Sequence, residues 1–159
     1  MRTKGQTSIH LLLASIVTLF GVMLILITLA MSWEAWMVPI IVIGNSLVWI
    51  LHIGRVGSET FYENLCAGLL MIGFFFFGVH DIVLYDIPAV ACMLLLIFSM
   101  FNKKRLLYMT AGLYLLELTY HFFLLHTITL DMGAKNMIRL GFGASVVTGA
   151  VTIAIYRIN

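Results

Sequence analysis

Six long apolar runs follow one another along this chain, and short polar stretches separate them. The runs cover residues 9–31, 36–53, 61–79, 87–101, 106–126 and 137–156. An α-helix needs about 20 apolar residues to cross the hydrocarbon layer of a bilayer. The pattern therefore predicts an all-α fold: a polytopic bundle of six transmembrane helices that forms a single domain over residues 1–159.

The positions of the basic residues predict the orientation of this bundle. Of the nine Lys and Arg residues, only Lys135 and Arg139 fall on the side opposite the two termini. The remainder are Arg2, Lys4, Arg55, Lys103, Lys104, Arg105 and Arg157. Because loops rich in Lys and Arg stay in the cytoplasm, we expect both termini to be cytoplasmic and the chain to be a multi-pass protein of the cell membrane.

The composition excludes several classes of protein. With 62% apolar and 10% charged residues, the chain cannot build the polar surface of a soluble domain, so its expected partner is the lipid bilayer. A net charge of +2 forms no basic stripe, and no nucleic-acid partner is expected. The sequence also lacks the common zinc, serine-nucleophile, phosphate-loop and Cys-x-x-Cys motifs. We therefore expect no enzyme activity, no catalytic residue, no cofactor and no metal.

Small residues in the sixth run predict where helices pack. Helices in lipid associate where their backbones approach closely, which small side chains allow. Gly141, Ser145 and Gly149 recur every four residues and so share one helix face. We expect this face to contact a neighbouring helix.

Polar residues inside the apolar runs are the main candidates for function, because they are costly in hydrocarbon. Thr110, Tyr114, Glu117 and His121 follow steps of three and four residues, which places them on one face of the fifth helix. Burial favours a neutral Glu117 or a hydrogen-bonded pair with His121, and Asn45 lies at a comparable depth in the second run. A structural contact between helices, recognition of a ligand or ion, and proton transfer all remain open for this group.

A second polar group gathers near the expected outer ends of the helices. Its members are Glu34, His80, Asp81 and His126. These residues show no recognised metal-ligand spacing. They could instead line a shallow outer pocket for an extracellular small molecule.

Several stretches of the chain resemble a known family. They are Gln6–Leu13, His52–Cys66, Asp86–Cys92, Tyr120–Thr127 and Tyr156–Asn159. Together they look like the membrane-embedded N-terminal sensory region of bacterial hybrid sensor histidine kinases. That resemblance assigns no binding residues, because the sensory region has no generally established ligand.

The resemblance implies a function in signal transduction by a two-component system. We expect a transmembrane sensory module that relays a ligand or membrane signal to a cytoplasmic output domain absent from this chain. In that family, a cytoplasmic region with a phospho-accepting histidine would make the protein a homodimer. An end at Asn159, just past the sixth run, suits a boundary before such a region. The alternatives are a small solute-binding transporter subunit and a membrane assembly subunit.

Overall fold

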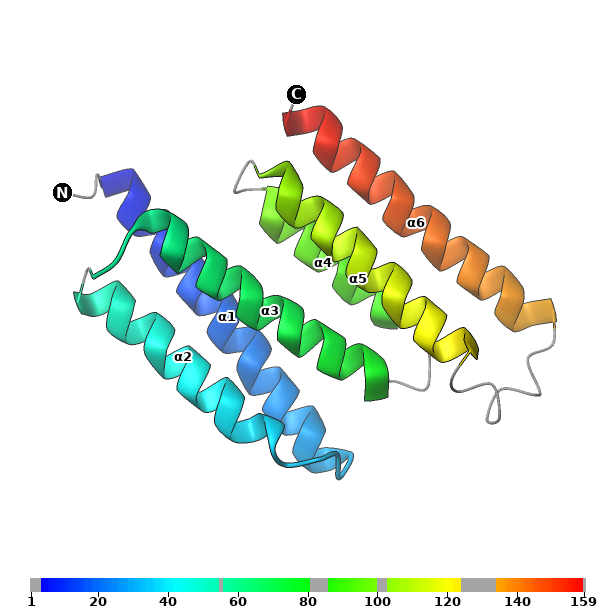
Figure 1. The fold of residues 1–159 in the computed structure, drawn as a ribbon, viewed down its shortest axis with the longest axis horizontal. Helices are drawn as coiled ribbons and strands as arrows, with labels where there is room; N and C mark the ends of the chain where they lie inside the picture. The colour runs from blue at the N-terminus through cyan, green and yellow to red at the C-terminus, as the bar shows by residue number, and fades with distance from the viewer. Residues whose placement is uncertain (1–3, 55, 81–85, 100–102, 124–133, 159) are drawn as a thin grey trace. The chain divides into compact units, whose positions relative to one another are not determined.

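The computed structural model describes residues 4–54, 56–80, 86–99, 103–123 and 134–158. Throughout these ranges the regular structure is helical (Figure 1). The helices are α1 (Lys4–Ala30), α2 (Met37–Gly54), α3 (Glu59–His80), α4 (Asp86–Ser99), α5 (Lys104–Phe123) and α6 (Ala134–Ile158). Each apolar run corresponds to one helix, so the predicted all-α fold with six helices is confirmed for the described residues.

Three of the described helices are long and apolar enough to cross a membrane. They are α1 over His10–Ala30, α2 and α3. Helix α4 and the Gly143–Arg157 part of α6 are apolar but shorter. By length and composition, the chain therefore has the features of a membrane protein.

The ends of the helices follow from local sequence. Pro39 and Pro88 lie in the first turns of α2 and α4, where a backbone N–H has no partner within the helix. The Ser58 hydroxyl caps the start of α3 by accepting a hydrogen bond from the Phe61 N–H at 3.2 Å. After α1, Ser32 adopts a φ of 55°, a left-handed conformation that closes the turn following a helix.

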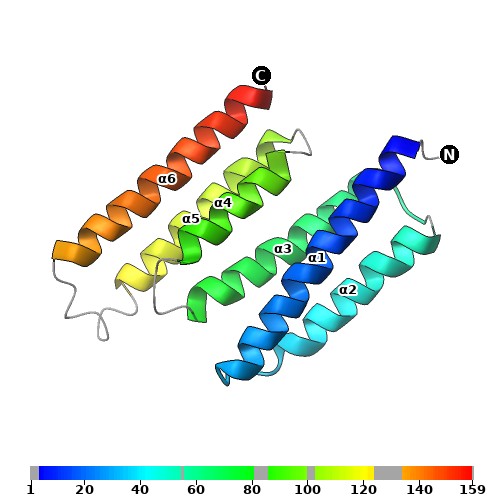
Figure 2. The ribbon, with the colours of Figure 1, turned by 180° about the vertical axis from the view of Figure 1, so that it is seen from behind.

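The chain divides into two compact units, Met1–Gly73 and Phe74–Asn159. In the first unit α1 packs against α2, and α3 lies close to both helices (Figure 2). The absence of a side chain at Gly44 leaves space for Leu69 of α3. A Cβ atom at position 73 would lie 2.7 Å from the ring of Phe20 in α1. Glycines thus set the close approach of α3 to its neighbours. The single six-helix domain stays a prediction.

The second unit contains the end of α3 together with α4, α5 and α6. Helix α4 contacts both α5 and α6, and α5 contacts α6. One face of α4 supplies much of the core through the buried residues Ile87, Ala91, Leu94, Leu95 and Phe98. These positions recur every three or four residues, as expected for one face of a helix.

Within the second unit, helix α6 packs on α4 and α5 through a face other than the one that carries Gly141, Ser145 and Gly149. Its buried positions among the described side chains are Gly143, Val147 and Ala154. Gly141, Ser145 and Gly149 are exposed, and a Cβ atom at either of these glycines would meet nothing within 4 Å. These three residues therefore do not pack against the described parts of α4 and α5, and their contact with a neighbouring helix stays a prediction.

The physical reason lies in α4 and α5. A Cβ atom at position 143 would lie 2.8 Å from Cγ of Pro88 and 3.0 Å from the Tyr114 hydroxyl. Only glycine fits between these two groups. The face of α6 that packs is therefore chosen by the shapes of partners distant in sequence, and small-residue spacing on α6 alone does not identify it.

This contact predicts different effects for two glycine substitutions in α6. Gly143→Leu should lower the stability of the protein by about 1–3 kcal/mol or more, because the larger side chain must displace Pro88 or Tyr114. Gly149→Leu should leave it almost unchanged. Thermal melting of the purified protein in detergent measures both effects. A larger loss for Gly149→Leu would show that the exposed face of α6 is the one that packs.

Candidate functional site

The four polar residues predicted to share a face of α5 do share a buried one. The exposed fractions are 0% for Thr110, 1% for Tyr114, 0% for Glu117 and 3% for His121. The Thr110 hydroxyl donates to the Leu106 carbonyl oxygen of its own helix at 2.9 Å, so it needs no partner from elsewhere. Tyr114, Glu117 and His121 remain as the candidate site.

The Glu117 carboxyl group lies against Gly78, in the last turn of α3. A Cβ atom at position 78 would overlap the carboxyl atoms, so only glycine permits this arrangement. Neither carboxyl oxygen has a hydrogen-bond partner among the described residues. A buried carboxylate without a partner is costly, so this environment favours the neutral acid.

His121 connects α5 to the same turn of α3. Its Nε2 atom is hydrogen-bonded to the Gly78 carbonyl oxygen. Because a carbonyl can only accept, Nε2 carries the proton. The last four carbonyl groups of a helix have no partner within the helix, so the imidazole acts as a cap for the end of α3.

Of the two alternatives expected for Glu117, a neutral carboxyl or a hydrogen-bonded pair with His121, the pair is not formed in this structure. His121 donates to the backbone of α3 instead, and the Glu117 oxygens have no partner among the described residues. A backbone carbonyl at a helix end gives no signal in residue identity.

Tyr114 approaches a glycine of α6, as Glu117 approaches a glycine of α3. Its ring is buried, and its hydroxyl lies near Gly143. This hydroxyl also has no hydrogen-bond partner in the described part of the chain. One face of α5 thus presents two unpartnered polar groups, each opposite a glycine of another helix.

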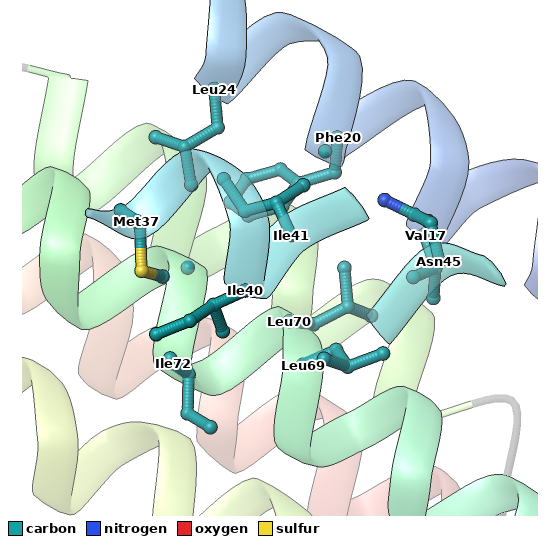
Figure 3. Close-up of a pocket in the computed structure, with 12 residues that line it drawn as sticks. Val17, Phe20, Leu24, Met37, Ile40, Ile41, Asn45, Leu69, Leu70 and Ile72 are labelled. Atoms are coloured by element: carbon teal, nitrogen blue, oxygen red, sulfur yellow. The ribbon is translucent and has the colours of Figure 1, made fainter. Parts of the chain in front are cut away.

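Asn45 belongs to the first unit. Its amide nitrogen lies against Gly21 of α1, and its Oδ1 atom is buried with no partner in the described chain. Figure 3 shows the side chain at the edge of an apolar cavity of about 20 Å³ between α1, α2 and α3. That volume holds about one water molecule.

A cluster of aromatic and imidazole rings in the first unit was not predicted. The rings of His10 and Tyr62 stack at 4.5 Å, and the Tyr62 hydroxyl donates to the His10 carbonyl oxygen at 3.1 Å. His52 lies 6.4 Å from the Tyr62 ring and packs edge-on against Trp49. One feature of the sequence could have indicated this cluster: these polar aromatic residues lie near the start of α1, the end of α2 and the start of α3.

The predicted outer group is only partly described. Glu34 is exposed in the first unit, and His80 ends α3 with its Nδ1 atom hydrogen-bonded to the Phe76 carbonyl oxygen at 2.8 Å. Asp81 and His126 lie outside the described residues. The outer pocket stays a prediction.

The described side chains offer no metal centre. No group of three or more His, Cys, Asp or Glu residues among them could hold a metal ion. Cys66 and Cys92 are both free thiols.

Similarity to known proteins does not identify the site. No protein-family model matches the sequence, and no curated protein or solved structure is detectably similar to it. The site must be interpreted from its own geometry.

The contact between Glu117 and Gly78 predicts an unusual response to a small substitution. Gly68→Ala, in the same helix, should be neutral or stabilising by up to ~1 kcal/mol, because nothing lies within 4 Å of the new Cβ atom and alanine favours helix. Gly78→Ala should instead cost about 1–3 kcal/mol, because the methyl group overlaps the Glu117 carboxyl.

Detergent denaturation of the two variants measures this difference, and a double-mutant cycle assigns its cause. Shortening the partner in Gly78→Ala/Glu117→Ala should recover part of the loss caused by Gly78→Ala. Strictly additive effects would show that the two residues are not in contact.

Proposed function

We propose that the chain is a multi-pass protein of the cell membrane in which all six helices cross the bilayer and both termini are cytoplasmic. The three long apolar helices support this proposal. The position of the basic residues supports the orientation, since Arg105 and Arg157 fall at the side of the termini. Helix α5 can serve as a span despite Glu117, because that carboxyl is buried inside the protein.

Within this topology, we propose that the chain is a sensory module that passes a signal to a cytoplasmic output domain. One observation carries the proposal. The Glu117 carboxyl is fully buried with no hydrogen-bond partner among the described residues, and it lies against Gly78, whose carbonyl oxygen accepts the hydrogen bond from His121. A packing contact would be better served by an apolar side chain, because an unpartnered polar group destabilises the fold. Groups of this kind concentrate at functional sites.

The arrangement also offers a route from the site towards the C-terminus. Glu117 contacts α3, and Tyr114, one turn earlier on α5, contacts α6 at Gly143. Helix α6 ends in the cytoplasm in the proposed topology, at the point where the resemblance to histidine kinases expects the output region. A stimulus acts through such a route only if it binds two arrangements of the helices with different affinities.

The topology predicts the location of reporter domains fused to the chain. Reporters placed after Asn159 and within Gly54–Ser58 should be active in the cytoplasm. Reporters within 81–86 and 129–136 should be active outside, because the basic residues flank the other ends of the helices. An external C-terminus would overturn both the count of spans and the direction of signalling.

The sensory role predicts an effect of Glu117→Gln on output at normal abundance. In a chimera of residues 1–159 with a histidine-kinase catalytic region, this variant should lock basal autophosphorylation in one state. The amide keeps the size of the side chain but cannot ionise. Glu59→Gln, in the first turn of α3, removes a carboxyl far from the site and serves as the control.

Autophosphorylation in isolated membranes, normalised to the amount of chimera, is the measurement. His121→Gln should also change the output if both residues belong to one site. Unchanged autophosphorylation in both variants would leave these residues with a structural role only.

A further inference from the structure

The contact between Glu117 and α3 restricts what the site can bind. The side chain is 0% exposed, and its carboxyl group is so close to Gly78 that even a methyl group would not fit between them. A metal ion would need several further oxygen ligands around it. An organic solute would need space beside the carboxyl group. A proton needs neither.

We propose that the Glu117 carboxyl is a proton-binding site whose occupancy controls the His121 cap on α3. This inference names the stimulus of the sensory module proposed above and rests on that function. With the proton bound, the neutral acid is tolerated between α5 and Gly78. When the O–H bond breaks, the proton passes to water and the electron pair stays on the carboxylate oxygen.

The change in charge alters the competition for the imidazole N–H. In the described structure, His121 donates from Nε2 to the Gly78 carbonyl oxygen. A carboxylate is a stronger acceptor than a neutral carbonyl, and Glu117 lies one helical turn from His121 on the same face. Loss of the proton therefore draws the N–H from Gly78 to Glu117. The last turn of α3 then loses its cap.

Few other titratable groups compete for this role. On α5 they are His121 itself, the buried Tyr114, the partly buried Tyr120 and the exposed Tyr108, with Lys104 and Arg105 at the far end of the helix. On the end of α3 there is His80, bonded to the Phe76 carbonyl oxygen. On α4 they are Asp86, which is exposed, and Cys92, a free thiol. The described side chains of α6 add only Tyr156 and Arg157, near its C-terminal end.

Infrared spectroscopy of the full chain in lipid vesicles tests proton binding directly. Acid-minus-alkaline difference spectra should contain the C=O band of a protonated carboxylic acid. Other carboxyl groups titrate as well, so the band of Glu117 is identified as the one that is present in the wild type and in Glu59→Gln and absent in Glu117→Gln. If no band depends on Glu117, or if that band does not titrate with pH, the proposal is wrong.

Hydrogen–deuterium exchange tests the coupling to His121. The readout is deuterium uptake by the 74–80 segment of α3 relative to the 59–66 segment at the same pH, which removes the chemical pH dependence of exchange. In the wild type, this ratio should rise over the pH range in which the infrared band disappears. Glu117→Gln should keep the ratio low at every pH.

His121→Leu provides the decisive comparison for the cap. This variant cannot donate to Gly78, so its exchange ratio should be high at every pH, while the Glu117 band should still titrate. A Glu117 band that titrates in the wild type with no change in the exchange ratio would overturn the proposed coupling. Chimera output that depends on Glu117 without a titrating band would overturn the proton proposal and leave the sensory function standing.

Discussion

The described structure depends on how each polar group in an apolar helical protein finds a hydrogen-bond partner. Most hydroxyl side chains solve this locally by donating to a carbonyl of the preceding turn of their own helix. Examples are Ser15, Thr28, Ser46, Thr119 and Thr152. Their bonds require nothing from other helices, so these residues carry little information about function. Glu117 and Tyr114 have no such local bond, and with Asn45 they contain buried polar atoms that lack a hydrogen-bond partner among the described residues.

Glycine sets where these two groups are accommodated. Gly78 and Gly143 face the Glu117 carboxyl and the Tyr114 hydroxyl, whereas a Cβ atom at Gly68 or Gly112 would meet nothing within 4 Å. The first pair is therefore fixed by packing, and the second pair is free to change. The presence of glycine in a helix does not by itself distinguish these two pairs of glycines. They differ in which side chains of other helices approach each position.

The sequence predicted the polar face of α5 because helical periodicity is a local property. Steps of three and four residues place Tyr114, Glu117 and His121 together whatever surrounds the helix. Their partners could not be predicted in the same way. The acceptor for His121 is a backbone carbonyl, and the packing face of α6 is selected by Pro88 and Tyr114. Both depend on tertiary contacts that leave no pattern in the sequence of α6 or the end of α3.

Helix α5 approaches both α3 and α6 at glycine residues. Glu117 lies against Gly78 with no side chain between the helices, and Tyr114 meets Gly143 in the same manner. Glycine has no side chain that could change its rotamer. A displacement of α5 must therefore be taken up by the side chains of Glu117 and Tyr114 or by movement of the helices. Tightly packed interfaces respond to such displacement by moving between discrete arrangements, since they do not deform continuously. In the proposed sensory module, a charge gained or lost at Glu117 would act on both contacts, because Glu117 and Tyr114 belong to the same helix.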